Sequence, residues 1–176
     1  MKRRSTILLV SYLVSSISYL LLSGCGFHLR GAGSATLPES LWRLRVVVQD
    51  SKLANDPLLV AVKGALQTDP NVVIAEELDV PTLALFGEGT DSQVLSVGSS
   101  GRVSGYRLKY EVSFRLADAK GREWLAPQSV RLIRDYTFDP LNVLAKEQEE
   151  QELKRTMQRD AVQQILRRLS RATIKN

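Results

Sequence analysis

The sequence predicts an α+β fold in which two α-helices pack on one face of a mixed, mostly antiparallel sheet of about four strands. Three observations support this prediction. One helix follows the first strand, consecutive strands joined by short turns fill the middle of the chain, and a long amphipathic helix ends it. Elements in this order favour a two-layer sandwich, because each must bury one apolar face against another.

The first strand and first helix are predicted between residues 42 and 74. Apolar and mostly polar residues alternate over residues 42–48, which places one set of side chains on a single face of a strand. Asn55-Asp56-Pro57 is typical of a helix start, since a capping side chain precedes proline at the first helical position. Asp69-Pro70-Asn71 is predicted to end this helix, and residues 72–74 to form a short strand or extended return.

The middle of the chain predicts consecutive antiparallel strands. A strand is expected at residues 82–88, and residues 94–97 are expected to lead through the turn Gly98-Ser99-Ser100-Gly101 into residues 106–116. In that last segment six apolar residues occupy the even positions and five polar residues the odd ones. This pattern predicts a strand with one buried and one wet face. After a turn at residues 118–121, a final strand is expected around residues 128–138.

The C-terminal helix is predicted to start at Asp139-Pro140 and to run to about Ala172. An apolar stripe follows one side of it: Leu153, Met157, Ala161, Val162, Ile165, Leu166 and Leu169. A stripe of this width is typical of a helix that packs on a core, and we expect it to cover the even-numbered face of the strand at residues 106–116. The charged residues of the opposite side are interpreted as a solvated face.

The N-terminus has the parts of a bacterial secretion signal. A basic cluster at residues 2–4 precedes a mostly apolar run, and Leu22-Ser23-Gly24-Cys25 resembles the lipobox of bacterial lipoproteins. The resemblance implies cleavage before Cys25 and attachment of acyl chains to this single cysteine, which anchors a protein durably. One alternative is an uncleaved membrane helix, but the run at residues 7–22 is shorter than the roughly 20 residues of a span. The other is a buried core cysteine, which the position disfavours.

The predicted organisation is a cleaved signal peptide at residues 1–24, a lipidated tether at residues 25–40 and one sandwich domain at residues 41–176. Glycine, serine and proline in the tether suit irregular chain. Loss of the signal would leave 21 basic and 19 acidic residues, so the formal charge of +5 would fall to +2 and gives no reason to expect nucleic acid binding. Gly26 at the position after the cysteine implies, by resemblance to enterobacterial sorting rules, the outer membrane.

The sequence offers no arrangement typical of an active site. His28, the one histidine, lies three residues from the expected lipid, and adjacent acids such as Glu76-Glu77 do not face each other on a helix. Gly87-Glu88-Gly89 lacks the spacing of a phosphate-binding loop. We therefore expect a protein that is not an enzyme and that holds no cofactor and no metal. A hydrolase whose site the sequence does not reveal is the weakest alternative.

Basic residues cluster around the central hairpin, and two interpretations of them stay open. The cluster consists of Arg102, Arg107, Lys109, Arg115, Lys120 and Arg122. The favoured interpretation is ordinary strand polarity, with charges that protect sheet edges. The functional interpretation is a surface for anionic groups such as the phosphates of a lipid headgroup.

Several segments together resemble the LPS-assembly lipoprotein LptE family. Residues 25–31, Cys-Gly-Phe-His-Leu-Arg-Gly, are similar to the start of its mature proteins. Arg134-Asp135-Tyr136, Asp139-Pro140, Leu144-Ala145-Lys146 and residues 165–169 are similar to its closing strand and helix. The likeness covers nearly the whole mature chain, and it depends on the order and spacing of these pieces.

This resemblance implies a two-helix, mixed-sheet sandwich and a non-catalytic outer-membrane lipoprotein that faces the periplasm and the barrel interior. Such a protein plugs the LptD β-barrel, assists its assembly and helps deliver lipopolysaccharide to the cell surface. The implied partners are LptD, lipopolysaccharide and, through Cys25, the membrane. The family's Leu-Ala-Lys element implies that Lys146 contacts lipopolysaccharide, and Arg102, the basic residue nearest the hairpin turn, is the second candidate. The alternative is a periplasm-facing lipoprotein that binds anionic lipid independently of a barrel.

Overall fold

The computed structural model describes residues 36–51, 53, 55–99, 101–137 and 143–172. Within these ranges lie a short 3₁₀ turn, two α-helices and five strands. Their bounds are η1 Glu39–Leu41, β1 Arg43–Val48, α2 Pro57–Leu66, β2 Val73–Ile74, β3 Thr82–Val97, β4 Val103–Ala117, β5 Glu123–Thr137 and α3 Val143–Leu169. The segments that contain Cys25, His28 and Asp139-Pro140 lie outside the described residues.

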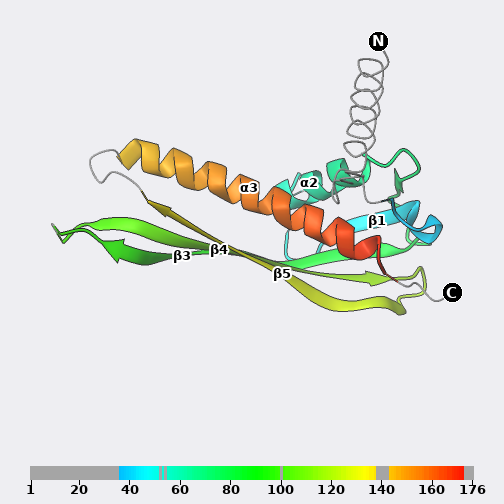
Figure 1. Cartoon of the computed structure of the whole chain (residues 1–176). Coiled ribbons are helices and arrows are strands. Elements are labelled where there is room, and N and C mark those ends of the chain that lie inside the picture. Colours follow the sequence, from blue (N-terminus) through cyan, green and yellow to red (C-terminus); the bar gives the residue numbers. More distant parts are fainter. Residues whose placement is uncertain (1–35, 52, 54, 100, 138–142, 173–176) are drawn as a thin grey trace, which may run out of the picture. The chain divides into compact units, whose positions relative to one another are not determined.

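The strands form one mixed sheet in the order β2-β1-β3-β4-β5. β1 is parallel to both β2 and β3, whereas the long β3–β4 and β4–β5 pairs are antiparallel. Figure 1 shows α2 and α3 on the same side of this sheet. The predicted α+β sandwich is therefore confirmed. The sheet has five strands rather than about four, because the short segment after α2 pairs with β1 through Val73 and Ile74.

The local signals at the first helix are confirmed. The carboxylate of Asp56 accepts hydrogen bonds from the backbone N–H groups of Leu58 (2.9 Å) and Leu59 (3.2 Å), and Pro57 occupies the first helical position. A capping side chain of this kind satisfies backbone donors that have no partner within the helix. The helix ends at Leu66, just before the Asp69-Pro70-Asn71 segment predicted to stop it.

The core lies between the two helices and one face of the sheet. The even-numbered residues of β4 from Leu108 to Leu116 are buried, as the alternation predicted. The stripe of α3 is buried as well, including Met157, Ala161 and Ile165. These two apolar surfaces belong to one cluster, so the pairing of the last helix with the central strand is confirmed.

β3 is longer than the sequence predicted. The two expected segments, residues 82–88 and 94–97, belong to one 16-residue strand, because the polar residues between them pair with β4. A bulge separates the pairs Phe86↔Ser113 and Gly89↔Glu111. Gly87 lies in this bulge with φ +61°, and its N–H donates to the carboxylate of Asp50 (2.6 Å). β1 pairs with β3 only as far as Leu85, so beyond it the described residues leave the outer edge of β3 open.

The bulge is tied to α3 by three side chains. The hydroxyl of Tyr110 donates to Glu88 Oε1 (2.6 Å), and Gln158 Nε2 donates to the same oxygen (3.0 Å). Burial, followed by the hydrogen bond to Glu88, raises the pKa of Tyr110, which keeps its hydroxyl protonated. These contacts connect β3, β4 and α3 at the point where the β3–β4 hairpin leaves the core.

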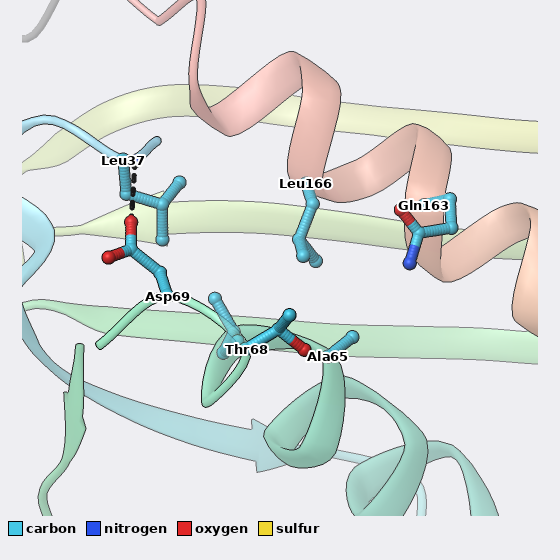
Figure 2. Close-up of a pocket in the computed structure, with 7 residues that line it drawn as sticks. Leu37, Ala65, Thr68, Asp69, Gln163 and Leu166 are labelled. Atoms are coloured by element: carbon cyan, nitrogen blue, oxygen red, sulfur yellow. Dashed lines mark hydrogen bonds between the residues drawn. The ribbon is translucent and has the colours of Figure 1, made fainter. Parts of the chain in front are cut away.

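The folded domain includes residues that precede residue 41, where the sequence predicted the domain to begin. Leu37 is buried in the core, and its N–H donates to Asp69 Oδ2 (3.3 Å), as Figure 2 shows. The indole of Trp42 donates to the carbonyl of Leu37 (3.3 Å). Beside Leu37 and Asp69 lies a cavity of about 70 Å³ between α2 and α3 (Figure 2), which has room for only a few water molecules.

Candidate functional site

The two residues predicted to contact lipopolysaccharide lie at the same end of the sheet. Arg102 directly precedes β4, and Lys146 lies in the first turn of α3. Figure 1 shows the β3–β4 turn and the start of α3 at one end of the sheet. We call this region the hairpin end and define it by Val94, Leu95, Val97, Arg102, Tyr106, Tyr136 and Lys146.

An aromatic pair holds Lys146 at the hairpin end. The amine of Lys146 lies 4.3 Å from the centre of the Tyr106 ring, which is within the range of a cation–π interaction. The ring of Tyr106 in turn stacks on Tyr136, with centroids 5.8 Å apart and an interplanar angle of 22°. The cation is therefore positioned over a platform built from β4 and β5.

The platform is connected back to α3 by a carboxylate. The hydroxyl of Tyr136 donates to Glu150 Oε2 (2.8 Å), and Lys154 pairs with Glu150 Oε1 (2.7 Å). The hydrogen bond from Lys154 lowers the pKa of Glu150, and burial raises the pKa of Tyr136. At neutral pH the acceptor is therefore charged and the donor protonated, which suits this hydrogen bond.

Arg102 is exposed and lies beside the turn that joins β3 to β4. The turn before it is closed by hydrogen bonds from Gly98 N–H to the carbonyl of Arg102 (2.7 Å) and from Gly101 N–H to the carbonyl of Gly98 (3.0 Å). No acidic side chain of the described residues forms an ion pair with Arg102. Four residues of extended chain, roughly 13 Å, separate it from Tyr106. The two cations thus belong to the same end of the sheet, and their binding of lipopolysaccharide stays a prediction.

Sequence reasoning missed the exposed aliphatic residues of this region. Val94, Leu95 and Val97 are 55%, 43% and 57% exposed. The signal is a group of three apolar residues just before a turn, and the sequence predicts this segment only as strand. The stacking of Tyr106 on Tyr136 was also missed, since the two residues are 30 positions apart and their register follows from the fold.

The sheet face opposite the helices carries a ladder of polar pairs. Arg107 forms two hydrogen bonds of 2.8 Å with Asp135, and Arg131 contacts Glu111 at 2.9 and 3.2 Å. Pairs exposed to this degree contribute little stability, at most about 1 kcal/mol each. Since Arg107 is paired, strand polarity is the better interpretation for this member of the basic cluster. The ladder makes this face of the sheet polar.

The described part of the chain contains no group of three or more histidine, cysteine, aspartate or glutamate side chains placed to hold a metal ion. None of its helices is both long and apolar enough to cross a membrane.

Comparisons with known proteins agree on one family. Residues 44–169 match the family model described as "LptE: Lipopolysaccharide-assembly". The LPS-assembly lipoprotein LptE of Pectobacterium atrosepticum is 28% identical over 159 residues, covering 89% of this chain and 83% of the relative. Its counterpart in Yersinia enterocolitica is 30% identical over 160 residues, covering 89% and 73%.

Two solved lipoprotein structures share the fold of this chain. The rare lipoprotein B of Shewanella oneidensis superposes with a TM-score of 0.63 and 31% identity, covering 73% of this chain and 94% of that one. A lipoprotein B from Nitrosomonas europaea gives a TM-score of 0.66 and 31% identity, covering 82% and 90%. The similarity thus extends over most of the described sandwich.

Proposed function

This chain belongs to the LptE family, which is not an enzyme family, and from this premise we propose a role in lipopolysaccharide export. The proposed protein is a non-catalytic outer-membrane lipoprotein, anchored through acyl chains on Cys25. It plugs the LptD β-barrel, assists its assembly and helps deliver lipopolysaccharide to the cell surface.

The observation that carries the lipid part of this proposal is the position of Lys146 over Tyr106. An ammonium group binds phosphate as a compact point charge, and lipopolysaccharide carries phosphates. Holding the cation over the ring limits the side-chain freedom that binding would otherwise remove. Arg102, exposed at the same end, offers a second cation to the same ligand.

The plug role is supported by the two different faces of the sandwich. One face of the sheet is covered by the helices and buried, and the other carries the ladder formed by Arg107–Asp135 and Arg131–Glu111. The interior of an outer-membrane barrel is polar, so a plug needs surfaces that tolerate a polar wall. The charged pairs of the ladder form a polar surface of this kind.

One observation favours the second candidate, a lipoprotein that binds anionic lipid without a barrel. Arg102 is available to a ligand in the free domain, because it forms no ion pair within the described residues. Both candidates predict lipopolysaccharide binding, whereas only the first predicts a barrel partner.

Co-purification separates the two candidates. The full-length protein, expressed at native level and extracted from membranes with mild detergent, is expected to bring down one large β-barrel, identified by mass. Recovery of the protein alone would contradict the plug role.

A charge-reversal pair tests the lipid role. R102E/K146E is expected to lose lipopolysaccharide binding, whereas R167E/R171E, with the same change of charge on exposed residues elsewhere, is expected to keep it. Equal affinity of the two variants would contradict the assignment of Arg102 and Lys146.

A further inference from the structure

Two arginines lie on either side of β3, on the sheet face opposite the helices. Arg45 of β1 pairs in register with Thr82 of β3, and Arg115 of β4 pairs with Ala84. Paired residues share a face of the sheet, and so do residues two positions apart in one strand. Leu83, between Thr82 and Ala84, is buried in the core beneath the helices. The two arginines therefore lie on the side away from α2 and α3 (Figure 1).

Neither arginine has an acidic partner. Arg45 and Arg115 form no ion pair within the described residues. The Nε atom of Arg45 is buried and has no hydrogen-bond partner in this part of the chain, which is unusual for a buried polar atom. The hydrogen bond from Lys63 (2.8 Å) lowers the pKa of Glu76, and the charge of Arg45 adds to this shift from a greater distance. The acid nearest in charge to Arg45 is thus already paired.

Apolar side chains fill the space between the two arginines. Val47 pairs with Ala84, and Phe86 follows on the same face of β3. Val47 and Phe86 are partly buried, and Ala84 is only 5% exposed although the helices lie on the other face. Side chains of this same face therefore cover Ala84. We call Arg45, Val47, Ala84, Phe86 and Arg115 the two-arginine surface.

The composition of the two-arginine surface is that of a protein interface. Arginine and aromatic residues are enriched where proteins bind one another, whereas isolated apolar residues on a free surface are less ordered in arrangement. Strand spacing and rise place the Cα atoms of Arg45 and Arg115 roughly 12 Å apart. This separation fits two carboxylates at neighbouring positions of a partner, one on each guanidinium group. The ladder farther along the same face differs, because its arginines are paired within the domain.

We propose that the two-arginine surface docks against the barrel partner, where Arg45 and Arg115 each bind a carboxylate of an acidic surface and apolar side chains of the partner cover Ala84 and Phe86. The inference rests on the proposed function for the identity of the partner, and it adds the part of the sheet that meets the barrel. A guanidinium group binds a carboxylate through two parallel hydrogen bonds. A second copy of this chain on the same face would bring further arginines to the interface, so charge favours an acidic partner.

The test uses the full-length lipoprotein, tagged and produced at native level beside the untagged wild type. R45Q/R115Q removes both positive charges of the surface and keeps polar side chains. R167Q/R171Q makes the same changes at exposed arginines near the end of α3 and serves as the matched control. Thermal unfolding by circular dichroism compares their folding, and R115Q alone replaces the double variant if R45Q/R115Q is less stable than the control.

The amount of barrel that co-purifies with each tagged protein is the main measurement. R45Q/R115Q is expected to recover on the order of tenfold less barrel than R167Q/R171Q, because desolvated arginines at an interface carry much of its binding energy. Both variants are expected to bind purified lipopolysaccharide with equal affinity, since Arg102 and Lys146 are unchanged in each.

Equal recovery of the barrel by wild type, control and R45Q/R115Q would overturn the docking surface and leave the proposed function standing. A wild-type preparation without a barrel would instead contradict the proposed function. Weaker lipopolysaccharide binding by R45Q/R115Q alone would overturn the choice of a protein carboxylate, because the arginines would then bind lipid phosphates. A wild-type dimer that R45Q/R115Q dissociates would overturn it as well, since the occupant would be a second copy.

Discussion

The amine of Lys146 in α3 lies 4.3 Å from the centre of the Tyr106 ring in β4, and this contact joins the helical layer to the sheet at the hairpin end. The two residues are 40 positions apart, so the contact exists only in the folded sandwich. It places the cation of Lys146 over an aromatic ring of the sheet, and the proposed lipid-binding role rests on this position.

The first prediction concerns the platform under this cation. Tyr106→Leu is expected to weaken lipopolysaccharide binding by roughly two- to fivefold, because a partly exposed cation–π contact is worth about 0.5–1 kcal/mol. Tyr106→Phe keeps the ring and is expected to retain most of the affinity. The check is the dissociation constant for lipopolysaccharide, and equal losses in the two variants would contradict a positioning role for the ring.

The second prediction concerns the two faces of β4. Phe114 is fully buried, so Phe114→Ala is expected to lower the free energy of unfolding by about 3–5 kcal/mol. Ser113 faces the opposite side, where its hydroxyl hydrogen-bonds that of Ser129 (2.8 Å), and Ser113→Ala is expected to cost about 1 kcal/mol. Urea denaturation measures both values. Similar losses at the two positions would mean that the assignment of faces is wrong.

The third prediction concerns acid sensitivity. The hydrogen bond from Lys154 lowers the pKa of Glu150 below its ordinary value of 4.5, so the folded state holds this carboxylate charged more strongly than the unfolded state does. The resulting stability is present above pH 4.5 and is lost as the pH falls through the folded-state pKa. Glu150→Gln is expected to flatten the fall of the unfolding free energy in that range. Unchanged pH profiles of stability would contradict this linkage.

The fourth prediction separates the anchor from the fold. Cys25→Ser is expected to remove the acyl chains and to mislocalise the protein, because these chains are its proposed membrane anchor. The melting temperature of the domain is expected to stay unchanged, since the core is built from residues 37–169. Membrane fractionation and circular dichroism check the two parts. A variant that is unfolded would contradict the separation.

Local sequence signals predicted the parts of the fold that depend on local chemistry. The cap at Asp56, the alternation along β4 and the stripe of α3 each follow from one segment and its period. The full length of β3 could not be predicted in this way. Its polar middle becomes a strand through pairing with β4, and its own residues show no alternation there.

The candidate site was predictable only in part for the same reason. Lys146 and Arg102 were named from a resemblance and their basic character, but the Tyr106–Tyr136 stack and the place of the exposed aliphatic residues depend on register. The buried position of Leu37 was missed because glycine, serine and proline around it indicate irregular chain, while its burial comes from packing against distant residues.

The most direct test of the central claim is the native mass of the complex extracted from membranes. Native mass spectrometry of the full-length lipoprotein, expressed at its normal level and released in mild detergent, is expected to show one copy bound to one large β-barrel. A spectrum that contains only the lipoprotein, from membranes in which the barrel is present, would contradict the plug role.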